Sequence, residues 1–304
     1  MARQDYITKS EIKSLARTSD LAGALLVLHC WGTIVLMVAM FTIWPNVLTF
    51  IIAFFVISGR QLGIAILMHD ASHGILFKSD KLNAFFGQYF LGIVIGVDLP
   101  TYRKYHLKHH RFTQQDKDPD LGLSAAFPTT KWSLVRKTLR DLSGVTGLKL
   151  RLGQLYMTFR KPSEGETSEQ AFNAKKIVMT YAANLALFLL CYLAGYWWAY
   201  FALWLLPLLT GFQLVLRIRN IAEHAMTSKD DNPLTHARTT KANIIARILV
   251  APYWVNYHVE HHAYMYVPCW QLKGLHTAML RNGHEKNMEI KKSYFDVLRT
   301  VVST

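Results

Sequence analysis

Two long stretches of the chain are free of charged side chains, and they restrict the class of protein. No Asp, Glu, Lys or Arg occurs in residues 21–59 or in residues 177–216. A helix needs about 20 apolar residues to cross a bilayer, so each stretch, of about 40 residues, can cross twice. Helices on the surface of soluble domains keep a polar face, and these stretches have none. The pattern excludes an ordinary soluble domain and a disordered chain, and predicts an all-α integral membrane protein.

Each uncharged stretch has a turn signal near its middle. Pro45 and Asn46 follow Trp44 in the first stretch, and Gly195 precedes three aromatic residues in the second. Pro, Gly and Asn favour turns, whereas Trp and Tyr favour the membrane–water interface. We therefore expect four transmembrane helices in two hairpins, with spans at about residues 21–41, 47–68, 177–194 and 198–216.

The charged residues lie outside both uncharged stretches. There are 34 Lys and Arg against 20 Asp and Glu, which gives a formal net charge of +14. Residues 1–20, 69–176 and 217–304 should share one side of the membrane, and the positive-inside rule makes that side cytoplasmic. Part of the positive charge suits anionic lipid headgroups, and no nucleic acid partner is expected. We expect a single domain over residues 1–304, with a histidine-rich helical cap on the four spans.

Three segments complicate this outline. Residues 84–97 are apolar but too short to span a bilayer, so they predict an interfacial or re-entrant segment. Arg60 lies within the second span, where it either extends to the interface or faces the interior of the bundle. Residues 161–176 are polar and predict a loop.

Eight of the 13 histidines form three tight clusters. These are His69 and His73; His106, His109 and His110; and His258, His261 and His262. Residues three or four apart share a helix face, so each cluster should present its imidazoles to a common point. Zinc takes about four ligands, so this number of imidazoles suits two metal ions better than one. Imidazole binds iron, copper, zinc and nickel alike, and the spacing leaves the metal open.

The three clusters, interleaved with two apolar hairpins, resemble the membrane fatty acid desaturase family. That family also contains carotenoid hydroxylases and ketolases and sphingolipid desaturases. The resemblance covers residues 59–276, and residues 217–224 and 255–258 look most like bacterial acyl-lipid desaturases. It implies two non-haem iron ions, dioxygen as oxidant, and a bacterial inner membrane. It also implies an external electron donor, such as a ferredoxin or a cytochrome b5 type protein.

The same resemblance implies a ninth histidine, and an asparagine, before the third cluster. His224 fits the histidine, and Asn220 lies four residues earlier on the same helix face. Asn220 is expected to bind directly or through water, and the alternative is a capping or packing amide. The full set of expected metal ligands is His69, His73, His106, His109, His110, Asn220, His224, His258, His261 and His262.

Other residues near the clusters have expected roles as well. Metal-bound histidines usually donate their second ring nitrogen to a carboxylate or carbonyl, and the candidate carboxylates are Asp70, Glu223, Glu260, Asp116, Asp118 and Asp120. We expect His29 to be buried and hydrogen-bonded, and His236 and His284 to be solvated. A functional role for His276 is not favoured.

The chemistry follows from a metal centre at a bilayer surface. Aliphatic C–H bonds offer no acid, base or leaving group, so breaking them needs a strong oxidant. The sequence predicts oxygen-dependent desaturation of a lipid acyl chain, and the alternative is a carotenoid or lipid hydroxylase or ketolase. A metal transporter would need more polar groups in the spans, and a zinc hydrolase would need a carboxylate base and fewer histidines. Lys104, Lys108 and Arg111 flank the second cluster and could contact an acidic electron donor.

Overall fold

Within residues 5–159 and 174–303, which the structure describes, four helices are long and apolar enough to cross a membrane. In this computed structural model they are α2 (Asp20–Ile43), α3 (Val47–His73), most of α9 (Ala174–Leu193), and a broken helix over Trp197–His224. The all-α membrane fold is thereby confirmed. Two spans run beyond their expected ends, because α3 continues to His73 and the last span to His224. The segment 160–173, where the sequence predicts a loop, lies outside the described residues.

The last span is assembled from several helical pieces. These are α10 (Trp197–Ala199), the π-helix η3 (Tyr200–Leu205), α11 (Leu206–Leu209) and α12 (Gly211–His224). Pro207 interrupts the helical hydrogen bonding here because it has no backbone N–H. The span therefore changes its helical pitch midway and delivers His224 from its final turn.

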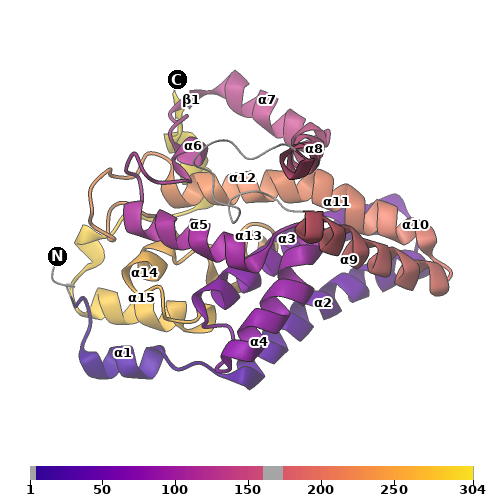
Figure 1. Cartoon of the computed structure of the whole chain (residues 1–304). Coiled ribbons are helices and arrows are strands. Elements are labelled where there is room, and N and C mark those ends of the chain that lie inside the picture. Colours follow the sequence, from indigo (N-terminus) through magenta and orange to yellow (C-terminus); the bar gives the residue numbers. More distant parts are fainter. Residues whose placement is uncertain (1–4, 160–173, 304) are drawn as a thin grey trace.

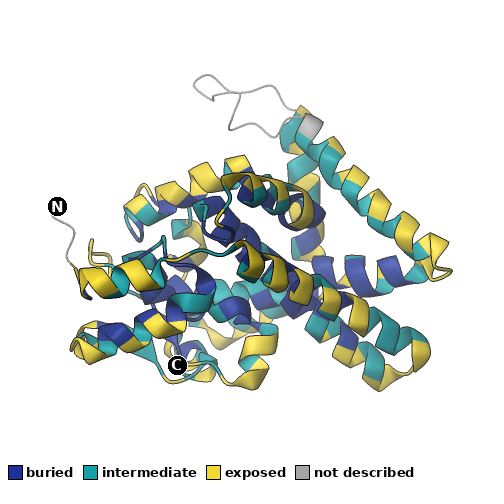
Figure 2. Ribbon diagram, turned by 90° about the horizontal axis from the view of Figure 1, so that it is seen from below, coloured by how far each residue is buried: buried dark blue, intermediate teal, exposed yellow. Residues whose placement is uncertain are grey.

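The two hairpins point the same way, and both chain ends lie at the opposite end of the molecule (Figure 1). In the apolar windows of α3 and the last span, 61% of residues are buried, against 17% in α2 and none in α9. Figure 2 shows the buried residues gathered where the hairpins meet the other helices. Thus α3 and α12 form the inner pair of spans, while α2 and α9 present apolar side chains to the bilayer.

The remaining elements form the helical cap at the other end of the molecule. The helices are α1 (Lys9–Leu15), α4 (Asp80–Phe85), α5 (Leu99–Phe112), α6 (Leu121–Ser124), α7 (Lys131–Leu142), α8 (Val145–Phe159), α13 (Ile244–Leu249), α14 (His258–Ala263), α15 (Leu272–Arg281) and α16 (Tyr294–Thr300). Short helical turns are η1 (Phe86–Gly92), η2 (Ile93–Ile95), η4 (Pro252–Trp254), η5 (Cys269–Gln271) and η6 (Glu285–Asn287). Two parallel two-residue pairs join β1 (Thr129–Thr130) to β4 (Val302–Ser303) and β2 (Thr239–Thr240) to β3 (Ile290–Lys291).

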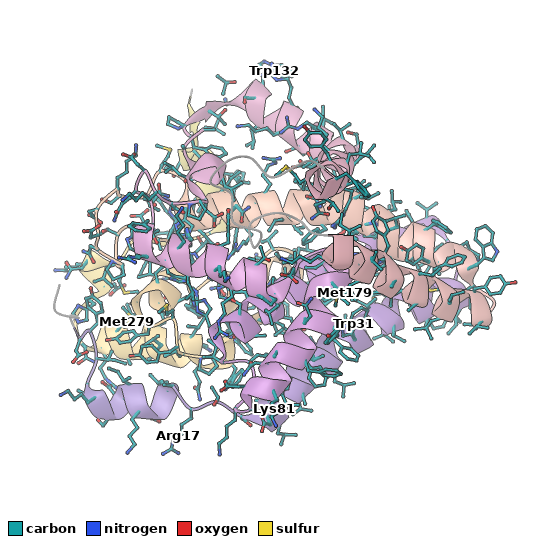
Figure 3. All side chains as sticks on the ribbon, in the orientation of Figure 1. Arg17, Trp31, Lys81, Trp132, Met179 and Met279 are labelled. Atoms are coloured by element: carbon teal, nitrogen blue, oxygen red, sulfur yellow. The ribbon has the colours of Figure 1, made fainter. Side chains whose placement is uncertain are left out.

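The apolar segment before the second histidine cluster ends in a sharp bend. The helical run Asp80–Ile95 and helix α5 meet at 90°. Gly96 makes the turn with a positive φ of 79°, and the Asp98 side chain caps α5 by accepting from the Thr101 N–H. Figure 3 shows Lys81, on α4, projecting away from the protein on the same side as Arg17. The bend leaves the histidines on its two sides free to meet, and the re-entrant segment stays a prediction.

Two glycines on α3 allow the segment before the third histidine cluster to approach closely. A Cβ on Gly59 would lie 2.2 Å from the carbonyl oxygen of Ile248, and one on Gly63 would lie 2.8 Å from the ring of Tyr253. Small residues spaced four apart let another segment pack against a membrane helix. The α13–η4 segment is held in this way against α3, and it leads directly into His258.

We predict that Gly59→Ala destabilises the protein, because the added methyl group must push α13 away from α3. Overpacking of this kind costs about 1–3 kcal/mol, which should lower the melting temperature in detergent. Gly32→Ala on α2 is the control, since a Cβ there meets nothing within 4 Å. Equal melting temperatures for the two variants would contradict close packing at Gly59.

Candidate metal centre

The structure gathers nine histidines into two neighbouring groups at the cap end of the inner spans. One group contains His69, His73, His106, His110 and His261, and the other contains His109, His224, His258 and His262. Within each group, one ring nitrogen from every member lies within 4.8 Å of one from every other member. These are the eight histidines of the three clusters together with His224.

The second and third clusters each serve both groups, which differs from the expectation of one common point per cluster. At 3.6 residues per turn, residues four apart are about 40° apart on a helix, while the residue between them lies on the other flank. His106 and His110 therefore join one group, while His109 joins the other. In α14, His258 and His262 pair in the same way, and His261 crosses to the first group. Helices α5 and α14 thus hold the two groups together.

The ring nitrogens within each group converge closely. The Nε2 atom of His261 lies 3.0 Å from Nε2 of both His69 and His110. In the other group, Nε2 of His258 lies 2.8 Å from that of His224 and 3.1 Å from that of His262. Two nitrogens each about 2.1 Å from a shared ion and at right angles would be roughly 3 Å apart. The observed spacing fits metal coordination.

Hydrogen bonds on the other ring nitrogen indicate which side of three imidazoles carries the lone pair. Nδ1 of His69 lies 3.2 Å from Asp70 and Nδ1 of His109 lies 2.9 Å from Asp118. Nδ1 of His224 lies 3.1 Å from the backbone oxygen of His236. Because these oxygens only accept, Nδ1 carries the proton, and Nε2 presents a lone pair to its group. Such converging lone pairs have nothing to donate to one another, so a cation is the partner that satisfies them.

Burial also favours the neutral, metal-binding form of the cap histidines. Desolvation, followed by repulsion from neighbouring imidazoles, lowers the pKa well below its ordinary value at His106, His258, His261 and His262. The same causes lower the pKa of His110. Neutral imidazole is the form that binds metal, so the site is prepared for a cation at neutral pH.

The end of α12 is fixed by a buried arginine. The side chain of Arg238 donates from Nη2 to the carbonyl oxygen of Ala225 at 2.8 Å. The backbone N–H of Arg238 donates to the backbone carbonyl oxygen of Glu223. A helix leaves its last carbonyls without internal partners, and Arg238 satisfies two of those around His224. Arg219 forms an ion pair with Glu223 one turn apart, and Glu223 lies 3.4 Å from Nε2 of His258.

The structure separates the carboxylates that follow the second cluster. Asp118 is buried against His109, whereas Asp116 is exposed and Asp120 lies 3.6 Å from the same Nδ1. Burial raises the pKa of Asp118, but hydrogen bonds from His109 and from the N–H groups of Asp120 and Gln114 outweigh it, and the net pKa is lowered. Asp118 is therefore an anion that holds His109 in place.

The carboxylate of the third cluster faces away from the two histidine groups. Glu260 is fully buried, accepts from the Thr239 hydroxyl at 2.5 Å and lies 2.5 Å from Nδ1 of His276. Thr239 in turn accepts from the N–H of Val259. Glu260 and His276 consequently fasten α14 to α15 and β2, which gives His276 a structural contact that the sequence did not indicate.

Asn220 lies beside the second group rather than within either group. Its carboxamide oxygen accepts from Arg219 at 3.1 Å. It lines a cavity of about 30 Å³ together with His109, His224 and His258, which is enough room for a water molecule. Ligation by Asn220 stays a prediction.

Three histidines outside the two groups differ from expectation. His236 is buried, with its ring centroid 5.3 Å from that of His262, because the loop after α12 folds back over the site. His284 is half-buried against Tyr6. His29 is hydrogen-bonded, as expected, to the Tyr253 hydroxyl at 3.1 Å, but its side chain is exposed. Contacts from segments distant in the sequence decide all three, and local sequence gave no signal of them.

Together, the membrane helices and the two imidazole groups define a membrane protein built to hold metal ions at the end of its spans. Comparison with known families agrees: the fatty acid desaturase model matches residues 41–294. The chain belongs to the fatty acid desaturase family, and it is an oxidoreductase of that desaturase and ketolase group.

Individual relatives with different reactions resemble this chain. A β-carotene ketolase of Paracoccus sp. (strain PC1) is 26% identical over 253 residues, which is 81% of this chain and 87% of the ketolase. A dihydrorhizobitoxine desaturase of Bradyrhizobium elkanii is 25% identical over 235 residues, or 73% of this chain and 65% of that protein. A sphingolipid delta(4)-desaturase DES1-like protein of Oryza sativa subsp. japonica is 32% identical over 120 residues, which is 38% of this chain and 35% of that protein.

We predict that Asp118→Asn weakens metal binding by roughly 10–100-fold, the usual effect of losing a partner of a metal-bound histidine. The neutral amide can hold His109 in the wrong orientation or tautomer. Metal titration of the metal-free protein in detergent measures the effect. Asp116→Asn is the matched control, because Asp116 is exposed and two residues away. Equal affinity in both variants would refute the role of Asp118.

Proposed function

We propose that the two histidine groups hold two non-haem iron ions. The observation that carries this proposal is the convergence of ring nitrogens in two adjacent groups, in which His69, His109 and His224 have their second nitrogen held by an acceptor. The larger group offers five imidazoles and the smaller offers four, with Asn220 beside it. Iron suits imidazole ligands, and the chain's family uses histidine clusters to bind metal.

We further propose that the reaction is oxygen-dependent desaturation of a lipid acyl chain. Bound iron supplies, with dioxygen and two electrons, the oxidising power that an unactivated C–H bond requires. Desaturation takes one hydrogen from each of two adjacent methylene carbons and forms a C=C bond. Dioxygen, with these two hydrogens, two electrons and two protons, becomes two molecules of water. The chain's own residues position the ions, keep the site dry by burial and hold the substrate chain in line.

A second candidate reaction is ketolation or hydroxylation of a carotenoid or lipid. The β-carotene ketolases among the relatives favour it, since one of them aligns with 81% of this chain. Hydroxylation differs from desaturation in its second step, where oxygen is transferred to carbon instead of a second hydrogen being removed. One oxygen atom then enters the product and the other becomes water. The two reactions are therefore distinguished by product mass.

We predict that cells expressing this chain accumulate acyl chains lighter by two hydrogens, only when oxygen is supplied. Lipid mass spectrometry measures the products, and products heavier by oxygen, or new keto-carotenoids, would assign the second candidate.

His261→Ala should abolish the reaction and lower the iron content from about two per chain, since His261 contacts two members of the larger group. His284→Ala is the control outside both groups. A fully active His261→Ala variant would refute the metal assignment.

We propose that the metal centre faces the cytoplasm of a bacterial inner membrane and receives electrons from a separate acidic protein, such as a ferredoxin or a cytochrome b5 type protein. The supporting features are the net charge of +14, carried by residues outside the two uncharged stretches, and the exposed basic residues Lys104, Lys108 and Arg111 on helix α5. A field of this sign speeds the approach of an acidic partner, and salt screens it.

We predict that turnover with limiting ferredoxin falls as ionic strength rises, through slower association. Inverted membrane vesicles should accept electrons from added donor, and right-side-out vesicles should not. Lys108→Gln should weaken the salt dependence, whereas Lys13→Gln on α1 should leave it intact. Turnover that is independent of salt would reject electrostatic docking, and donor access from the outer face would reject the proposed orientation.

A further inference from the structure

Arg60 is a buried cation without a carboxylate partner among the described residues. It lies within the second span, is only 6% exposed, and has no ion pair in that part of the chain. Its Nη2 donates to the carbonyl oxygens of Arg247 and Ile248 at 3.3 and 2.9 Å. No hydrogen-bond partner for its Nε lies among the residues that the structure describes. An ionised group at membrane depth is costly and usually functional, so Arg60 needs an anion that the described residues do not supply.

A cavity of about 560 Å³ lies against this arginine. Its lining includes Arg60, Arg247, His29, Tyr253, Val56 and Ile244. Its volume falls within the roughly 300–1,000 Å³ of small-molecule sites. The lining combines two cations and several hydrogen-bonding groups with an apolar wall, which is the surface that an acidic amphiphile requires.

The backbone beside the cavity is strained in order to place its aromatic residues. Tyr253 and Trp254 both have positive φ, of 51° and 58°, a conformation that is unfavourable for bulky residues. The Tyr253 ring lies over the Arg60 guanidinium at 5.4 Å, and its hydroxyl is 3.1 Å from His29. The wall of the cavity is therefore held in place by the close packing at Gly63 described above.

The cavity opens beside apolar side chains that face the bilayer. Ile244 and Ile245 on α13 are 75% and 63% exposed, and Leu25 and Leu28 on α2 are also exposed. A lipid could therefore place its acidic group at Arg60 and leave its acyl chain along these side chains.

We propose that this cavity binds the acidic group of a membrane amphiphile, either the phosphate of a phospholipid or the carboxylate of a free fatty acid. Arg60 and His69 are nine residues apart, which places them on opposite sides of α3. The amphiphile is therefore bound apart from the metal centre, and its binding does not depend on the reaction proposed above.

Native mass spectrometry of the purified protein in detergent tests the proposal with three probes: dioleoylphosphatidylglycerol, sodium oleate and dioleoylphosphatidylcholine. The wild type should retain one acidic molecule per chain more firmly than the neutral phospholipid. Arg60→Gln should reduce that retention about tenfold or more, as expected for loss of a charged hydrogen bond. Retention of phosphatidylglycerol alone would identify a phosphate site, and retention of oleate would identify a site that accepts a carboxylate.

Two further variants separate loss of the site from loss of folding. Val56→Trp should fill the cavity and remove the lipid while Arg60 remains. Arg136→Gln on α7 removes an exposed positive charge elsewhere and should leave retention unchanged. The two variants inside the cavity, Arg60→Gln and Val56→Trp, should keep the wild-type metal content, which would show that they fold. Equal retention of the acidic lipids by wild type and Arg60→Gln, or equal retention of the neutral phospholipid by the wild type, would overturn the proposal.

Discussion

The convergence of nine imidazoles on two points is the interaction on which the rest of this structure depends. Their ring nitrogens are buried, and several present lone pairs to one another at about 3 Å. Without a cation, each lone pair would lose its contact with water and gain no donor in return, which is costly in a low-dielectric interior. The fold must therefore hold these groups against their own repulsion. It does so by mounting them on the two most buried spans and on helices tied to those spans.

Each source of rigidity in the cap acts on a different part of the centre. Asp70 and Asp118 orient one imidazole in each group, and Arg238 satisfies the end of the helix that carries His224. Glu260 fastens α14 from behind, through contacts that do not point at the metals. Because these supports come from separate segments, none of the histidine clusters forms a complete site by itself. The site exists only when the bent segment that leads into α5, the inner spans and the α13–η4 segment are all docked.

The hairpins and the eight clustered histidines could be predicted from the sequence because both are periodic, local signals, whereas His224 is expected from the family resemblance. Uncharged runs fix the start of each span to within about one residue, although two spans continue beyond their expected ends, to His73 and His224. Spacings of three and four identify helix faces. What could not be predicted depends on contacts between distant segments. The spacing could not show that His109 and His261 cross to the opposite group, nor that Asp118 is buried while Asp116 is exposed. The sequence predicts that His236 is solvated, yet the fold of the loop after α12 buries it beside His262. The sequence also could not show whether Arg60 extends to the membrane interface or faces the interior of the bundle. The structure places it in the interior, because its side chain donates to carbonyl oxygens of α13.

Helix α3 shows how one membrane helix can serve two unlike sites. One face carries His69 and His73, which belong to a histidine group suited to binding a cation. The opposite face carries Arg60, a cation suited to binding an anion. The glycines that let α13 and Tyr253 pack closely against α3 lie beside Arg60. About 13 Å of helix separates the two levels, and a dry interior screens charges weakly. Placing the arginine on the far face keeps its positive charge away from the two histidine groups. The same closely packed turn that shapes its cavity also leads into the third histidine cluster. The local strain at Tyr253 and Trp254 is therefore tied to both sites, because relaxing that turn would move His258 as well as the wall beside Arg60.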